Sequence, residues 1–174
     1  MVLIAVFTAI MAICSWISVS AGPVPFTLQT FAVFVTAALL GTKRGTIAVV
    51  VYILLGIIGV PVFAGLTGGP SVIAGPTGGF IVGFILTAII IGLLMNLTNG
   101  KSEVVKLVIT VVAMVLGDVA CFAIGTVWFM VVTNNTVSVA LTYCVIPYII
   151  PDIAKIVVAT IIANRVKKYV QIFN

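Results

Sequence analysis

GGFIVGFILTAIIIGLLMNL, at residues 78–97, decides the fold class of this chain. The stretch carries no charge and is as long as the roughly 20 apolar residues that a helix needs to cross a bilayer. The charge-free sequence around this stretch extends over 45–100, and a second charge-free sequence covers 1–42. Both are far longer than a single span, so each is expected to contain more than one.

The composition supports a membrane protein. Of the 174 residues, 63% are hydrophobic and 6% are charged, whereas about a quarter of the residues in a soluble domain are charged. Backbone polar groups in lipid must be satisfied internally, which leaves helices or closed barrels. The apolar runs lack the strict alternation of barrel strands. We therefore predict an all-α integral membrane protein, a compact bundle of six transmembrane helices in one domain (1–174), at about 2–20, 28–41, 46–60, 78–97, 104–131 and 151–170.

The distribution of lysine and arginine predicts the topology. Seven of the eight cations lie in three short clusters, at 43–44, 101–106 and 165–168. Short cytoplasmic loops retain positive charge during insertion, and six spans place all three clusters on one side. Both termini are then cytoplasmic, in what we expect to be a prokaryotic plasma membrane. The net charge of +5 is explained by this topology, so no nucleic-acid partner is expected.

The three predicted external connections, 21–27, 61–77 and 132–150, contain no charged residue. The middle one is rich in glycine and proline, residues that break helices and permit unusual backbone conformations. It is also long for a structureless connection. These features favour a lid over a pocket.

Several classes of active site are excluded. The chain has no histidine, which removes the commonest general base, the commonest metal ligand and a Ser–His nucleophile. No GxxxxGK[ST] loop is present, so energy from ATP has to come from another subunit. Cys14, Cys121 and Cys144 form no CxxC pattern and are expected to be apolar filler, with no metal or cofactor.

Two of the three acidic residues lie within predicted helices. Asp118 and Asp152 leave open an intramembrane aspartyl enzyme, a class that typically carries a GxGD motif. Here the run Val115-Leu116-Gly117-Asp118 lacks the first glycine, which disfavours an enzyme. Asp118 either lines a cavity or binds a neighbouring helix, and we favour the structural role.

Asp152 and Lys155 are the strongest candidates for a binding site. Three residues apart on a helix, they share one face. Asp152 behind Pro151 suits the positive end of the helix dipole, but a lysine does not, and Lys155 also lies near the external face against the charge rule. Because charges inside a membrane protein are costly unless they are needed, the pair predicts a site for a mostly apolar molecule with one acid group.

Five strings occur in order along the chain: PVPFTLQT (23–30), GVPVFAG (59–65), GPTGGF (75–80), GTVWF (125–129) and PDIAK (151–155). Together they resemble the BioY family, the biotin-binding S components of energy-coupling-factor (ECF) transporters. The resemblance implies a six-helix subunit that captures biotin with high affinity from outside. It also implies as partners a transmembrane coupling protein and two cytoplasmic ATPases. An S component for another small vitamin is the alternative from the same class.

The resemblance also implies roles for individual residues. The D-x-x-K pair, Asp152 and Lys155, contacts biotin, and the segment containing Thr77, Gly78 and Gly79 closes the pocket. A small-residue stripe on the first helix, here Ala5 and Ala9, docks on the coupling protein. The thioether ring of biotin suits apolar walls, for which the candidates are Phe63, Phe80 and Trp128.

Overall fold

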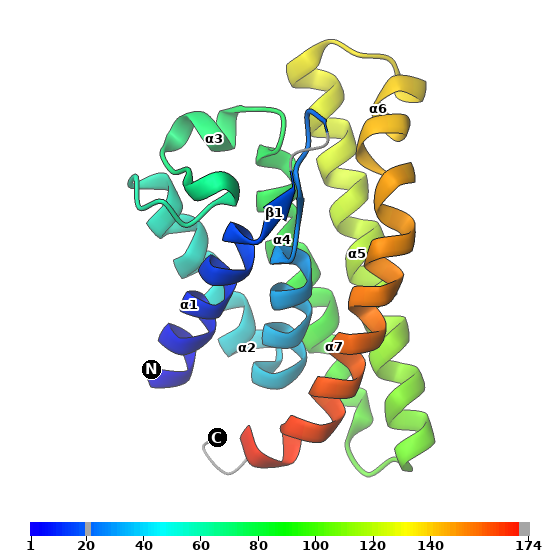
Figure 1. The fold of residues 1–174 in the computed structure, drawn as a ribbon. Coiled ribbons are helices and arrows are strands. Elements are labelled where there is room, and N and C mark those ends of the chain that lie inside the picture. The colour runs from blue at the N-terminus through cyan, green and yellow to red at the C-terminus, as the bar shows by residue number, and fades with distance from the viewer. Residues whose placement is uncertain (20–21, 171–174) are drawn as a thin grey trace.

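The computed structural model describes residues 1–19 and 22–170, and the side chains of these residues except 167–170. It is a bundle of long helices with a small hairpin and short helices at one end (Figure 1). In chain order the elements are α1 Val2–Trp16, β1 Ser18–Val19, β2 Phe26–Thr27, α2 Gln29–Ile57, the 3₁₀ helix η1 Ala64–Leu66, α3 Pro70–Ala74, α4 Gly78–Met95, η2 Asn96–Thr98, α5 Glu103–Thr133, α6 Val137–Cys144, η3 Ile146–Tyr148 and α7 Ile149–Val170.

Four helical segments in the described part of the chain are long and apolar enough to cross a membrane. They are Gln29–Ile57, Gly78–Thr98, Glu103–Thr133 and Val137–Val166, and α1 is a shorter apolar helix. The chain is therefore a mostly helical, multi-pass membrane protein.

Helix α2 consists of two antiparallel arms joined at Gly41. This glycine has φ 72° and ψ −174°, which breaks the helix. The side-chain nitrogen Nε2 of Gln29, in the first arm, lies 2.7 Å from the Tyr52 hydroxyl in the second arm. In one straight helix, residues with this separation would be about 35 Å apart. The two arms correspond to the separate helices expected at 28–41 and 46–60.

Small residues let α4 and α5 approach closely. A Cβ atom added to Gly83 would lie 3.2 Å from Cys121 Sγ, and one added to Gly117 would lie 3.1 Å from the Ile91 side chain. The Thr87 hydroxyl donates a hydrogen bond to the Gly117 carbonyl over 2.8 Å. The small-residue stripes of these two helices therefore serve packing inside the bundle.

Helix α1 ends at Trp16, which corrects the expected end at 20. The chain beyond it forms the antiparallel hairpin, where Ser18 pairs with Thr27 and Val19 with Phe26. The helix end is held by Trp16 Nε1, which donates to the Pro61 carbonyl over 2.8 Å. The contact with Pro61 joins distant parts of the chain, whereas the hairpin joins nearby residues, and together they override the continuing apolar pattern.

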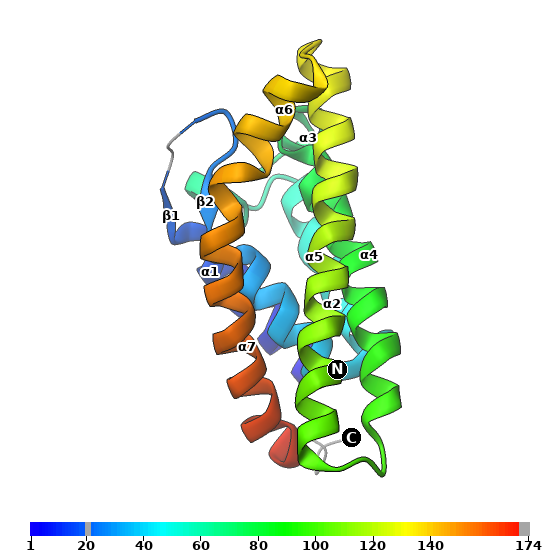
Figure 2. The same cartoon turned by 90° about the vertical axis from the view of Figure 1, so that its right-hand side faces the viewer.

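The other two connections that were predicted to be external also contain structure. The connection 61–77 includes η1 and α3, and 132–150 includes α6, η3 and the start of α7. Helix α6 runs back from the tip of α5, so α7 starts below that tip (Figure 2).

The cation clusters lie toward one end of the bundle. The junction between the two arms of α2, the connection between α4 and α5, and the end of α7 all lie toward the lower end of both views, whereas α3 and α6 lie at the upper end (Figures 1 and 2).

Candidate functional site

An open cavity lies between the start of α2, the connection 61–77, and helices α4, α5 and α7. Its empty space, including the part that opens to solvent, is ≈ 720 Å³. The lining residues come from every one of these elements: Val24, Pro25, Thr27, Gln29, Thr30, Phe63, Ala64, Thr67, Val72, Thr77, Phe80, Ile81, Phe84, Phe122, Cys144, Tyr148, Asp152 and Lys155.

Asp152 and Lys155 form an ion pair in the cavity wall. Lys155 Nζ lies 2.7 Å from Asp152 Oδ1, and the two side chains are 6% and 4% exposed, respectively. Their spacing along α7 places both on the face that is turned toward the bundle. Pro151 is in the first turn of α7, where its missing N–H leaves no helix hydrogen bond unmade.

Three groups from the N-terminal half and α7 surround the lysine ammonium. Besides Asp152, Lys155 Nζ donates a hydrogen bond to Thr30 Oγ1 over 2.9 Å. It also lies 4.3 Å from the centroid of the Phe26 ring, a cation–π contact. Asp152 Oδ1 accepts no hydrogen bond from the residues that the structure describes. This oxygen is enclosed by the protein, and its contact with Lys155 is an ion pair.

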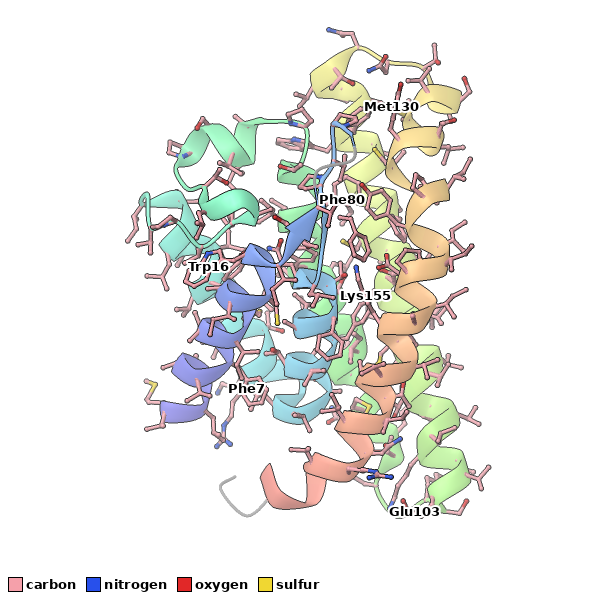
Figure 3. The ribbon with its side chains drawn as sticks, viewed as in Figure 1. Phe7, Trp16, Phe80, Glu103, Met130 and Lys155 are labelled. Atoms are coloured by element: carbon pink, nitrogen blue, oxygen red, sulfur yellow. The ribbon has the colours of Figure 1, made fainter. Side chains whose placement is uncertain are left out.

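Lys155 lies farther from the ends of the bundle than the sequence suggested. Figure 3 places Lys155 between Met130, near one end of the molecule, and Glu103, at the other. We expected Lys155 within one turn of the predicted external face, but α6 runs back from the tip of α5, so α7 begins below that tip (Figure 2). A buried ion pair contributes little net stability because desolvation offsets the attraction, so stability alone gives no reason for its presence here.

The other predicted site residues fall into two groups. Thr77, Phe63 and Phe80 line the cavity, whereas Gly78, Gly79 and Trp128 lie outside its lining. Gly78 is in close contact with the backbone of Ile73, and Gly79 with the Cβ atom of Trp128. These two glycines thus allow close packing around the cavity wall.

Trp128 supports the cavity wall from outside the lining. Its indole Nε1 donates a hydrogen bond to the Gly75 carbonyl over 3.0 Å. The contact holds the start of the GPTGGF segment, which includes Thr77, against α5.

One wall of the cavity was missed from the sequence. The segment 24–30 supplies five lining residues, and Phe122, Cys144 and Tyr148 supply three more. Tyr148 joins the two groups, because its hydroxyl donates to the Val24 carbonyl over 2.5 Å and its ring stacks on Phe26 at 6.4 Å between centroids. The conspicuous string PVPFTLQT was the available signal for this wall.

A hydrogen-bond relay runs from the cavity to α1. The Gln29 amide donates to Tyr52 Oη, and the Tyr52 hydroxyl donates to the Val62 carbonyl, each over 2.7 Å. Ser15 Oγ of α1 lies 2.5 Å from the same carbonyl. The relay fixes the backbone directly before Phe63.

Asp118 is buried in α5 and is not part of the cavity lining. The cavity therefore does not present the two carboxylates together, as an aspartyl enzyme would need.

Ala5 and Ala9 are exposed on the outer face of α1. The opposite face, with Phe7, Thr8 and Met11, is buried against the bundle. The outer face of this helix therefore carries small side chains at these two positions.

Comparison with known proteins identifies the family. The family model described as "BioY family" matches residues 1–172. The chain is 42% identical over 163 residues to a biotin transporter BioY of Thermotoga maritima, covering 94% of this chain and 92% of that protein. It is 38% identical over 165 residues to a probable biotin transporter BioY of Pyrococcus horikoshii, covering 95% and 94%.

A solved structure shares the fold. It is the S-component for biotin from an ECF-type ABC transporter, and it matches with a TM-score of 0.85 and 27% identity over 96% of this chain and 89% of that chain. By sequence and by fold, this chain belongs to the BioY family.

Proposed function

We propose that this protein captures biotin and takes it up across the cell membrane as the substrate-binding S component of an ECF-type ABC transporter. The observation that carries the proposal is the buried Asp152–Lys155 pair in the wall of an otherwise largely apolar cavity. The names of the related proteins and of the structural neighbour support it.

The chemistry of biotin suits this cavity. Biotin carries a carboxylate, a cyclic urea with two N–H groups and one carbonyl, and an apolar thioether ring. Lys155 offers a positive charge, and the Asp152 carboxylate lines the cavity beside it. Phe63, Phe80 and Phe122 line the same space and provide apolar surface for the thioether ring and the alkyl chain.

The proposed topology has six passes with both termini in the cytoplasm. The two arms of α2 are antiparallel, so each arm can make a pass of its own. The cation clusters lie toward one end of the bundle (Figure 1), as the charge rule requires of the cytoplasmic side. The opposite end, with α3 and α6, then faces outside.

Accumulation of biotin needs partners. The sequence has no P-loop, and a binding protein without an energy source only equilibrates its ligand across the membrane. The partners that we propose are a transmembrane coupling protein and two cytoplasmic ATPases.

The test is equilibrium binding of biotin to the purified protein in detergent, with other vitamins as competitors. Saturable binding of biotin that other vitamins do not displace supports the proposal. Displacement by a different vitamin at lower concentration would reassign the ligand. A folded protein that binds no biotin would refute the proposal.

A tryptophan on the outer face of α1 is expected to block assembly with the coupling protein. Ala9→Trp replaces a small exposed side chain, and close helix contact in membranes depends on such small residues. Copurification of the partner subunits and ATP-dependent biotin uptake should fall about tenfold or more, while biotin binding to the isolated subunit stays unchanged.

The matched control is Val158→Trp, on the exposed face of α7, which should leave assembly intact. Equal assembly of the Ala9→Trp variant and the parent protein would show that the partner docks elsewhere.

A further inference from the structure

Gln29 lies in the string PVPFTLQT (23–30) but was not predicted as a site residue. It is the first residue of α2, is 5% exposed and lines the cavity. Its backbone nitrogen donates to Thr27 Oγ1 over 3.1 Å. The next residue, Thr30, holds Lys155, so Gln29 lies directly beside the site of the ion pair.

The relay through Tyr52 determines which end of the Gln29 amide faces the protein. Tyr52 is fully buried, and its ring packs edge-on against Phe63 at 5.7 Å between centroids. Its single hydroxyl hydrogen is used on the Val62 carbonyl, a group that can only accept. Towards Gln29 the tyrosine oxygen is therefore an acceptor, and the amide nitrogen must face it.

The carbonyl oxygen of Gln29 is left without a protein partner. Among the described residues, no hydrogen bond to Gln29 Oε1 is found, and this atom is not one of the fully enclosed polar atoms without a partner. It consequently keeps contact with open space, and the open space next to Gln29 is the cavity. A positioned, unpaired acceptor in a largely apolar site selects a ligand that carries a matching donor.

We infer that Gln29 Oε1 accepts a hydrogen bond from a ring N–H of the bound cyclic urea and so determines ligand specificity. The inference rests on the proposed function, since biotin supplies the urea. Two urea N–H groups need two acceptors, and the Asp152 carboxylate and the Gln29 carbonyl oxygen both belong to residues that line this cavity. Tyr52 is a positioning residue, because it acts on the ligand through the orientation of the Gln29 amide.

The test combines changes in the protein with changes in the ligand. Gln29→Met keeps the length of the side chain and removes the acceptor, whereas Gln29→Glu keeps an acceptor. The ligands are biotin, two biotins methylated on one or the other urea nitrogen, and biotin methyl ester, which changes only the acid group. Dissociation constants are measured for all combinations, together with the melting temperature of each variant.

The expected result is a specific coupling between Gln29 and one urea nitrogen. Gln29→Met should weaken biotin binding about tenfold or more, the effect of leaving a buried donor unpaired. Methylation of the matching nitrogen should weaken binding to the parent protein but should cause little further loss in Gln29→Met. Gln29→Glu should retain the discrimination between biotin and this analogue, and Tyr52→Phe should lose part of it. The methyl ester should lose the same factor in the parent protein and in Gln29→Met.

Two outcomes would overturn the inference. One is that Gln29→Met binds biotin within about twofold of the parent protein, or loses affinity for all four ligands by the same factor. The other needs no variant: both N-methyl biotins bind the parent protein as tightly as biotin does. If the parent protein binds no biotin, the proposed function itself fails, whereas parent binding that does not depend on Gln29 refutes only this inference.

Discussion

Lys155→Met is expected to weaken biotin binding by roughly 100-fold or more, the effect of truncating one partner of a buried charge pair. The variant loses the positive charge that meets the acid group or the urea carbonyl of the ligand. It also leaves Asp152, 4% exposed, as a buried charge without its partner, which costs about 3–5 kcal/mol of stability. Both losses are measurable on purified protein, by equilibrium binding and by thermal unfolding in detergent.

A double variant separates the two effects. Asp152→Asn combined with Lys155→Met removes both charges, and replacing a complete buried pair by neutral groups is often close to neutral for stability. The melting temperature should therefore recover relative to Lys155→Met, while biotin binding should stay weak.

The control for the lysine is Lys106→Met. Lys106 also pairs with an acid three residues away, Glu103, over 2.7 Å, but the side chains are 36% and 86% exposed. Exposed pairs contribute little, so neither binding nor stability should change. Parent-like biotin affinity in Lys155→Met would contradict the assignment of the site.

Gly78→Ala is expected to lower the apparent Tm by about 5 °C or more and to weaken biotin binding. The added Cβ atom would overlap the carbonyl group of Ile73. The added Cβ atom would clash with backbone atoms of Ile73, so no change of side-chain rotamer relieves the clash. The turn between α3 and α4 therefore has to move. Thr77 and Val72 line the cavity on either side of this contact, so the wall moves as well.

The measurement is thermal unfolding in detergent with and without biotin. Gly22→Ala is the matched control, since apart from its chain neighbours no heavy atom of the described residues lies within 4 Å of its added Cβ. Identical melting temperatures and affinities for Gly78→Ala and the parent protein would show that the α3–α4 turn yields without effect on the site.

The long apolar runs were sufficient to predict the class of fold. Segments such as 78–97 are local features, and burial in lipid requires each to form a helix whatever its neighbours are. The helix boundary that was predicted wrongly, the end of α1, is one at which a distant contact is made. Helix α1 stops at Trp16 because that residue binds the Pro61 carbonyl, and no local pattern records this contact.

The site was predicted in part. The charge pair was found because a lysine inside an apolar segment is anomalous by composition alone. The opposite wall was missed because Val24, Pro25 and Gln29 carry no charge, although they lie in the string PVPFTLQT (23–30). Trp128 was expected to line the cavity, but its side chain lies outside the lining and donates a hydrogen bond to the Gly75 carbonyl.

A multi-pass helical membrane protein of the BioY family, with a charge pair on its last helix, could be predicted from the chain alone, because hydropathy, charge and motif are properties of neighbouring residues. The contacts of Lys155 with Thr30 and Phe26, and the position of Gln29 at the same cavity with a free carbonyl oxygen, became known from the three-dimensional arrangement of the helices. Those contacts join residues more than 100 positions apart in the chain, and their geometry follows from how α2, α6 and α7 pack rather than from any local pattern.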